Sequence, residues 1–217
     1  MPCFEDYPYL TRQEFDVCVE RFLARYSSAL SGSGAYAEKR ASSAGRQYLV
    51  LQRAIHAKRG TVKAAAIDIE VDIEDDDPAA TSPVYEHENT GHDMRIEYHA
   101  VYSATWRVPV LYVRVVASNG EVVLDGEKVC DMVTDDAQVR QAMAAVPFGG
   151  ALGVVDHPEL GVPFLYLHPC HTAELLRAIA PTGCSDTDVI RVGPDEYLAA
   201  WLSLSGSAVG LTLPICY

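Results

Sequence analysis

Apolar residues recur at helical spacing near the start of the chain. Thr11 and Glu14 match a capping box, in which each side chain bonds the backbone N–H of the other residue. The residues that follow form one apolar stripe on a helix, consisting of Phe15, Cys18, Val19, Phe22, Leu23 and Tyr26. We therefore predict a helix over 11–29 that packs on a core and ends in the serine- and glycine-rich stretch at 31–34.

The middle of the chain alternates between apolar and polar positions, which is typical of β-strands. Every second residue from Ile96 to Ala104 is apolar or aromatic, so this segment is a predicted strand. Alternation or a short apolar run predicts further strands at 47–55, 67–73, 108–116 and 122–124. Residues 47–55 taken alone also fit a helix, and we favour a strand because strands follow. Short turns join the later strands, which predicts an antiparallel meander sheet with flanking helices, an α+β architecture.

Two helices and a docked tail are predicted nearer the C-terminal side. One helix opens at 134–136 and carries its apolar residues up to position 146. Another begins at Pro194, with acidic residues in its first turn, and runs to Gly206. Its core-facing residues are Leu198, Trp201, Leu202 and Leu204. The segment 209–215 is apolar enough to pack on the domain.

The size and composition of the chain favour one core. The chain has 217 residues, 49% of them hydrophobic, so we predict a single domain over 1–217 with an acidic loop insertion around 74–92. Carboxylates line the polar face of the strand predicted at 67–73 and continue through Asp75–Asp77. They lack the glycine of a calcium-binding loop, so we interpret them as a solvated face and loop without catalytic duty.

The formal net charge of -13 argues against binding to a nucleic-acid backbone or to an acidic membrane surface. No apolar run approaches the length of a membrane span, so no stable membrane insertion is expected. The first residues lack the basic and apolar regions of a secretory signal. Six scattered cysteines without a C-x-x-C pair favour a reduced, cytoplasmic protein over a disulfide framework.

Cys170 is the residue with the clearest potential for chemistry. Phe164–Leu167 is a predicted strand, and Pro169 ends it because proline disfavours helical backbone at the preceding residue. Thr172 is the predicted N-cap of a helix that extends to residue 179. Cys170 would then lie in a tight loop two residues before a helix N-terminus, where the helix dipole favours a thiolate or an oxyanion. The alternative is a buried structural cysteine.

Three other cysteine chemistries fit less well. A phosphatase-type loop requires an arginine six positions after the cysteine, whereas this chain has Leu176 there and its arginine, Arg177, comes one residue later. A papain-like protease would place the cysteine in a long helix and add a distant histidine with an orienting residue. His168, Cys170 and His171 are too crowded for a zinc site, so no metal and no cofactor are predicted.

Four blocks of sequence resemble the autophagy E2-like conjugating enzymes. They are Tyr98–His99 and Tyr102–Ser103 with Val108–Tyr112, then His157–Phe164, then Leu167–Thr172, and finally Trp201–Ser203 with Val209–Pro214. Each block alone is weak, but all four occur in one order over residues 96–217. Trp106 departs from the family, which often has tyrosine there. No asparagine precedes Cys170 as in ordinary ubiquitin-conjugating enzymes, so the oxyanion donor and any general base stay open.

The resemblance implies a ubiquitin-conjugating, E2-like core and a transferase of the autophagy pathway. Cys170 would accept the C-terminal glycine of a ubiquitin-like autophagy modifier from an autophagy activating enzyme, and an acceptor protein with a target lysine would then attack the thioester. His168 is expected to shape the loop more than to transfer protons, with Pro169 and Thr172 in supporting roles. Tyr102 and Trp106 either flank the thioester or belong to the core. His99 and His157 are expected to be hydrogen-bonded structural groups.

Two other functions stay open at the level of the sequence. A sister enzyme of the same family attaches a ubiquitin-like modifier to phosphatidylethanolamine and carries a membrane-sensing helix. The helix predicted at 11–29 has a polar face of mixed charge and not the basic face of a membrane-surface helix. The other alternative is a non-catalytic module of the same fold that holds a ubiquitin-like protein, although such a module would usually lack the cysteine.

Overall fold

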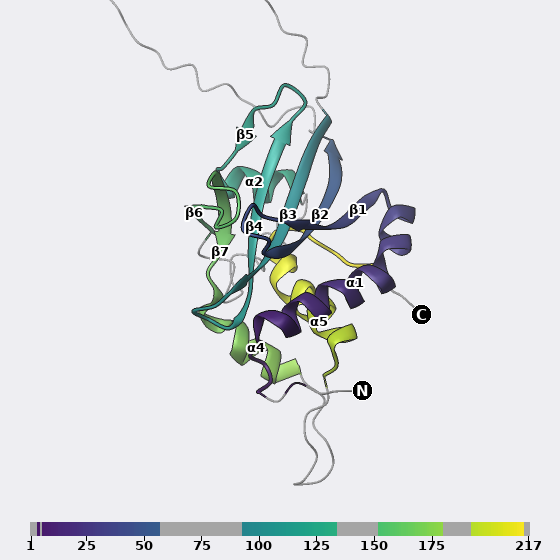
Figure 1. The fold of residues 1–217 in the computed structure, drawn as a ribbon. Coiled ribbons are helices and arrows are strands. Elements are labelled where there is room, and N and C mark those ends of the chain that lie inside the picture. The colour runs from purple at the N-terminus through teal and green to yellow at the C-terminus, as the bar shows by residue number, and fades with distance from the viewer. Residues whose placement is uncertain (1–3, 5, 57–92, 134–151, 180–191, 215–217) are drawn as a thin grey trace, which may run out of the picture.

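The computed structural model describes residues 4, 6–56, 93–133, 152–179 and 192–214. Within these ranges the strands form one antiparallel sheet of seven strands in the order β1-β2-β3-β4-β7-β6, with the short β5 paired to β4 (Figure 1). The strands are β1 (Ala35–Ala41), β2 (Gln47–His56), β3 (Asp93–Ser103), β4 (Val108–Ala117), β5 (Val122–Val123), β6 (Leu152–Asp156) and β7 (Pro163–Leu167). The helices are α1 (Arg12–Gly32), α2 (Gly126–Val133), α4 (Thr172–Ile179) and α5 (Pro194–Ser207), with a 3-10 turn at Pro169–His171.

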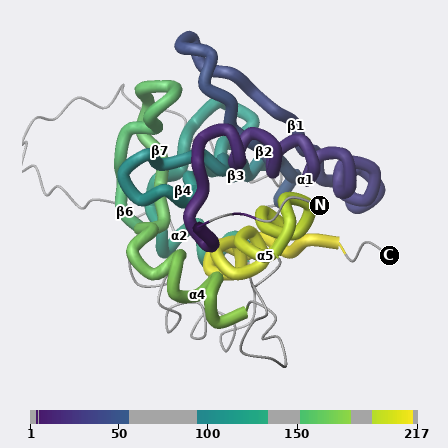
Figure 2. Tube along the Cα trace, turned by 60° about the horizontal axis from the view of Figure 1, so that its bottom comes forward, coloured from purple at the N-terminus to yellow at the C-terminus, as the bar shows by residue number. Residues whose placement is uncertain are grey.

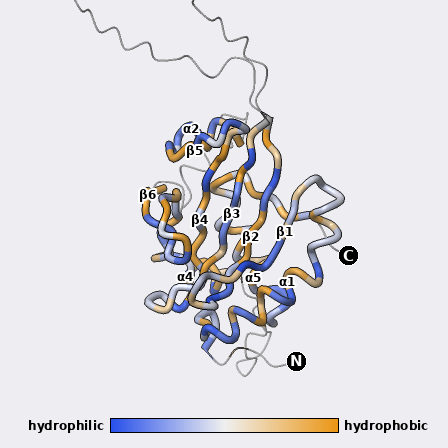
Figure 3. The backbone as a smooth tube through the Cα atoms, turned by 45° about the horizontal axis from the view of Figure 1, so that its top comes forward, coloured by the Kyte–Doolittle hydropathy of each residue, from blue (hydrophilic) through white to orange (hydrophobic). Residues whose placement is uncertain are grey.

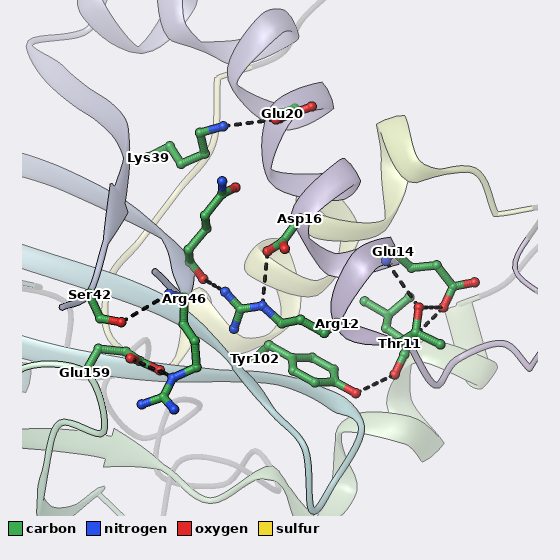
Figure 4. A network of polar contacts seen from close by, with 12 residues as sticks. Thr11, Arg12, Glu14, Asp16, Glu20, Lys39, Ser42, Arg46, Tyr102 and Glu159 are labelled. Atoms are coloured by element: carbon green, nitrogen blue, oxygen red, sulfur yellow. Dashed lines mark hydrogen bonds and ion pairs between the residues drawn. The ribbon is translucent and has the colours of Figure 1, made fainter. Parts of the chain in front are cut away.

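The capping box at the start of α1 is confirmed. The Thr11 hydroxyl accepts a hydrogen bond from the Glu14 N–H at 3.2 Å, and the Glu14 carboxylate accepts one from the Thr11 N–H at 2.6 Å (Figure 4). Two of the N–H groups that every helix leaves unpaired at its start are thereby satisfied. The predicted apolar stripe is buried in α1, except that Leu23 is only partly buried.

The main core lies between one face of the sheet and the helices α1 and α5, which pack against each other (Figures 1 and 2). Helix α5 begins at Pro194 as predicted and buries Leu198, Trp201 and Leu202. The segment after α5 docks as predicted: the carbonyl of Val209 accepts a hydrogen bond from Tyr98 Oη at 3.0 Å. The arrangement confirms the α+β architecture with an antiparallel meander and flanking helices.

Gly210 shows why the docked segment needs a glycine. Its φ of +68° lies in the left-handed region, and a Cβ built there would lie 2.6 Å from Cβ of Val133 in α2. Its carbonyl accepts a hydrogen bond from Arg53 of β2 at 3.0 Å. The glycine therefore lets the backbone pass close to α2 while it stays bonded to the sheet.

The opposite face of the sheet carries a smaller buried cluster. Tyr48, Val50 and Val101 form it, with the partly buried Tyr112 packed against them. Figure 3 shows β4 mostly in the hydrophobic colour, whereas β2 and β3 also carry hydrophilic positions. The sheet therefore carries buried side chains on both of its faces near its centre.

Several sequence predictions are confirmed and some elements were missed. The strands predicted at 47–55, 96–104, 108–116, 122–124 and 164–167 are present within a few residues of the predicted bounds. The sequence patterns did not predict β1, α2 or β6. The strand at 67–73, the acidic loop at 74–92 and the helix at 134–146 lie outside the described residues. Among the described helices, none has the length and apolar content that crossing a membrane requires.

Candidate active site

Cys170 lies at the surface, in the 3-10 turn that joins β7 to α4. His168 is the N-cap of this turn, and its Nδ1 accepts a hydrogen bond from the Cys170 N–H at 3.2 Å. Pro169 occupies the first position of the turn, where its fixed φ suits a helical start and its missing N–H costs no hydrogen bond. The sequence His-Pro-Cys therefore defines the backbone around the thiol.

The prediction that Thr172 is the N-cap is wrong. Thr172 has helical backbone angles, φ -55° and ψ -47°, and its N–H donates to the Pro169 carbonyl. Helical backbone begins at Pro169, four residues earlier than predicted, because the His168 side chain supplies the cap. Cys170 is consequently the second residue of the helical segment and does not precede the helix by two residues. Thr172 is buried in the first turn of α4.

The hydrogen bond from the Cys170 N–H also indicates which tautomer a neutral His168 ring adopts. A neutral imidazole has one acceptor nitrogen, and His168 Nδ1 uses it on the Cys170 N–H, so Nε2 carries the proton. The ring lies edge-to-face with Trp106, at 5.4 Å between centroids and 77° between planes, and 6.2 Å from the Tyr166 ring. This arrangement supports a loop-shaping role for His168, because its basic lone pair is occupied.

Trp106 and Tyr102 lie in different surroundings, although the sequence left the same two roles open for both. Trp106 is 42% exposed in the β3–β4 turn and its ring contacts that of His168, so it lies beside the residue that caps the Cys170 turn. Tyr102 is partly buried and donates its hydroxyl to the Leu10 carbonyl at 2.8 Å (Figure 4). Its ring lies 5.9 Å from that of Phe15. Burial raises the pKa of Tyr102, which keeps the phenol protonated. Tyr102 thus connects the β3–β4 hairpin to α1.

A segment that the sequence patterns did not single out runs beside the Cys170 turn. We call residues 6–10 the N-terminal strap. Tyr7 Oη donates to the Leu176 carbonyl of α4 at 2.8 Å, and the Leu10 N–H donates to the Arg107 carbonyl of the β3–β4 turn at 2.8 Å. The strap therefore touches the elements on both sides of Cys170. Tyr7 and Tyr9 of the strap form no periodic pattern, so its contacts with α4 and the β3–β4 turn could not be predicted from the sequence.

His99 and His157 form a buried pair on the outer face of the sheet. His157 Nδ1 accepts from the Glu159 N–H at 3.2 Å, so its Nε2 carries the proton and donates to His99 Nδ1 at 3.0 Å. Burial lowers the pKa of His99 to about 2 and that of His157 to about 4. Both rings are neutral at physiological pH and packed among aromatic side chains, as the structural role expected for them requires.

Glu159 connects this region to the β1–β2 turn. Its carboxylate accepts a hydrogen bond from Arg46 Nε at 2.8 Å (Figure 4). Burial opposes ionisation of Glu159, but the hydrogen bonds from Arg46 and Ser42 outweigh it and lower the pKa of the carboxyl. Within the described ranges, no three His, Cys, Asp or Glu side chains gather in a way that could hold a metal ion.

The sequence matches a family model over nearly its whole length. The model, described as the autophagocytosis associated protein active-site domain, covers residues 14–215. The chain belongs to this family. The match includes β3, β4, β7 and the Cys170 turn, so the resemblance found in the sequence to autophagy E2-like enzymes is confirmed.

Family members with curated names are similar over part of the chain. Ubiquitin-like-conjugating enzyme ATG10 of Homo sapiens is 32% identical over 124 residues, 57% of this chain and 52% of that protein. The enzyme of the same name from Arabidopsis thaliana is 30% identical, over 55% of this chain and 50% of that protein. The chain thus spans about half the length of the curated relatives it matches. A crystal structure of autophagic E2, Atg10, aligns over 92% of this chain and 98% of its own, with a TM-score of 0.45 and 14% identity.

Proposed function

We propose that this protein is an E2-like conjugating enzyme that carries a ubiquitin-like modifier on Cys170 and transfers it to a protein lysine. The observation that carries the proposal is an exposed thiol at the second position of a helical segment, held there by the His168 cap, within the family's active-site domain. The names of the relatives, ubiquitin-like-conjugating enzymes, support the same class of reaction.

The first step would be a thiol–thioester exchange. The Cys170 thiolate attacks the carbonyl carbon of the modifier's C-terminal glycine, which arrives as a thioester on a cysteine of an activating enzyme. A bond forms from Cys170 Sγ to that carbon, the bond to the activating cysteine breaks, and this cysteine leaves as a thiolate. The start of the Pro169–Ile179 helical segment favours the negative charge of the thiolate and of the oxyanion.

The second step would release the modifier onto the acceptor. The neutral amine of a lysine attacks the thioester carbon, an isopeptide bond forms, and Cys170 Sγ leaves as a thiolate. The amine proton passes to solvent, because the His168 lone pair is engaged by the Cys170 N–H. Trp106, 42% exposed beside His168, would form an apolar wall close to the reacting carbon.

Replacement of the nucleophile tests the proposal. Cys170→Ala should abolish the adduct with the modifier that reducing agent cleaves, and Cys170→Ser should trap an oxyester that resists reducing agent. Cys130→Ala is the matched control, because Cys130 is a free and partly buried thiol on α2. A gel of the purified components reads out both adducts. Conjugate formation by Cys170→Ala would refute the proposal, and binding of the modifier without any adduct in the wild type would favour a non-catalytic module.

A protein lysine is the better acceptor than a lipid amine. The chain carries a net charge of -13, which repels anionic lipid. The apolar stripe of α1 is buried in the core and is not available to a bilayer. The enzyme that carries the modifier as a Cys170 thioester should therefore transfer it to a purified acceptor protein in solution, without liposomes. Transfer to phosphatidylethanolamine vesicles, with none to protein, would instead assign the chain to the lipid-conjugating branch.

A further inference from the structure

The N-terminal strap brings one aromatic ring close to two cations beside the Cys170 turn. The Arg107 guanidinium carbon lies 5.5 Å from the centroid of the Tyr9 ring, and that of Arg177 lies 5.2 Å from it. Both distances are within the range of cation–π attraction. Arg107 belongs to the β3–β4 turn and Arg177 to α4, so Tyr9 links two elements that are distant in sequence.

Each of these elements is connected to the turn that holds Cys170, one by a ring contact and the other by the continuous backbone. Arg107 follows Trp106, whose ring contacts His168, and His168 caps the turn that holds the thiol. Arg177 lies on α4, which continues without a break from the Cys170 turn. The Tyr9 ring therefore contacts both supports of the catalytic loop.

We propose that Tyr9 is a positioning residue for the transfer reaction: its ring, in contact with both Arg107 and Arg177, keeps the Trp106 turn at a fixed separation from α4. The inference rests on the proposed function of Cys170. Without the ring, the two arginines lose their shared partner and their like charges repel each other. The Trp106 turn then gains freedom relative to α4, and the His168–Cys170 loop loses one wall.

Other contacts of the strap show that the loss of Tyr9 should not unfold the protein. Tyr197 Oη donates to the Pro8 carbonyl at 2.6 Å, and Asp6 pairs with Arg107 at 2.9 Å. The bonds from Tyr7 to Leu176 and from Leu10 to Arg107 also involve groups other than the Tyr9 side chain. Tyr9 is only partly buried and is not a member of the main core.

The two tryptophans of the chain provide a readout that is independent of catalysis. Trp201 is 1% exposed, whereas Trp106 is 42% exposed, so a neutral quencher such as acrylamide chiefly reports on Trp106. In Tyr9→Ala the quenching constant should rise about twofold as the turn loosens. Tyr9→Phe keeps the aromatic ring that both arginines contact and should match the wild type. Tyr36→Ala is the matched control, because it removes an exposed tyrosine from β1.

The catalytic readout is single-turnover discharge of a preformed Cys170 thioester onto the acceptor, measured well below the melting temperature of every variant. Tyr9→Ala should slow discharge about fivefold, and Tyr9→Phe should restore the rate. Unchanged discharge and quenching in Tyr9→Ala would overturn the inference, and so would equal losses in the two variants. If the wild type forms no thioester while quenching behaves as expected, the proposed function fails and the structural link from Tyr9 to Trp106 stands.

Discussion

Two loops with the sequence His-Pro-X follow neighbouring strands of the sheet. Residues 157–159 follow β6 and residues 168–170 follow β7. In both loops the histidine Nδ1 accepts a hydrogen bond from the backbone N–H of the third residue, at 3.2 Å each time. The same local device therefore turns the chain at the end of each strand, with Nδ1 as the acceptor in both rings.

The surroundings of the two loops differ. His157 is fully buried, its Nε2 donates to His99, and the third residue, Glu159, is held in an ion pair with Arg46. His168 lies between two aromatic rings near the surface, and the third residue, Cys170, is exposed. The comparison teaches that His-Pro-X specifies a backbone turn, whereas burial and the third residue decide whether the turn serves packing or chemistry.

The largest effect should come from breaking the buried loop. His157→Ala removes a buried ring and leaves His99 Nδ1 without its hydrogen-bond donor. We expect the free energy of unfolding to fall by about 3–4 kcal/mol, from the cavity and the unpaired nitrogen together. Urea denaturation measures this loss. His171→Ala, at an exposed histidine, is the control and should change stability by about 0.5 kcal/mol or less. A loss of that small size in His157→Ala would mean that the pair does not support the fold.

Acid should also distinguish the two loops. An unfolded histidine has a pKa near 6.5, whereas burial lowers the pKa of His157 to about 4 and that of His99 to about 2. Between these values the unfolded chain binds more protons than the native one. The stability that the two neutral histidines contribute is therefore fully present above pH 6.5 and is lost as the pH drops toward 4. Unfolding measured at pH 7 and pH 5 should show this decrease in the wild type and in His168→Asn. It should be smaller in His157→Gln, and an equal decrease there would contradict the assignment.

A smaller effect is expected from His168, and it separates capping from proton transfer. His168→Ala removes the cap and should cost about 1 kcal/mol of stability. It should also slow discharge of the Cys170 thioester about tenfold. Asparagine is a good N-cap without an imidazole base, so His168→Asn should recover most of the rate. Single-turnover kinetics give the comparison, and a His168→Asn enzyme as slow as His168→Ala would indicate proton transfer by the ring.

The sequence predicted the elements with strong periodicity and missed those that depend on partners. Helical spacing located α1, alternation located β3, an apolar run located β4, and a proline with acidic residues before apolar positions located α5. β1 consists of alanines, charged residues and one tyrosine without a clear apolar face, and it is a strand because all seven of its residues pair with β2. α2 buries only Val129 among its residues, but Asp125 before it accepts bonds from two N–H groups of its first turn. That capping aspartate was a signal in the sequence.

The candidate site was predicted in part. Cys170 could be singled out because strand, proline and helix signals surround it, whereas the capping role of His168 depends on ring orientation, which sequence does not give. Thr172 has the residue type of an N-cap, but Pro169 had already started the helical turn. The strap contacts could not be predicted either, because they join Tyr9 to residues about 100 and 170 positions away.

The packing of α5 and the segment after it on α1 has a consequence for co-translational folding. Helix α1 leaves the ribosome before α5, yet its buried stripe shares one core with Leu198, Trp201 and Leu202. Tyr197 bonds the strap, and Val209 and Gly210 bond the central strands. Until position 211 has left the exit tunnel, the nascent chain cannot close its main core, and the apolar side of α1 stays accessible to chaperones.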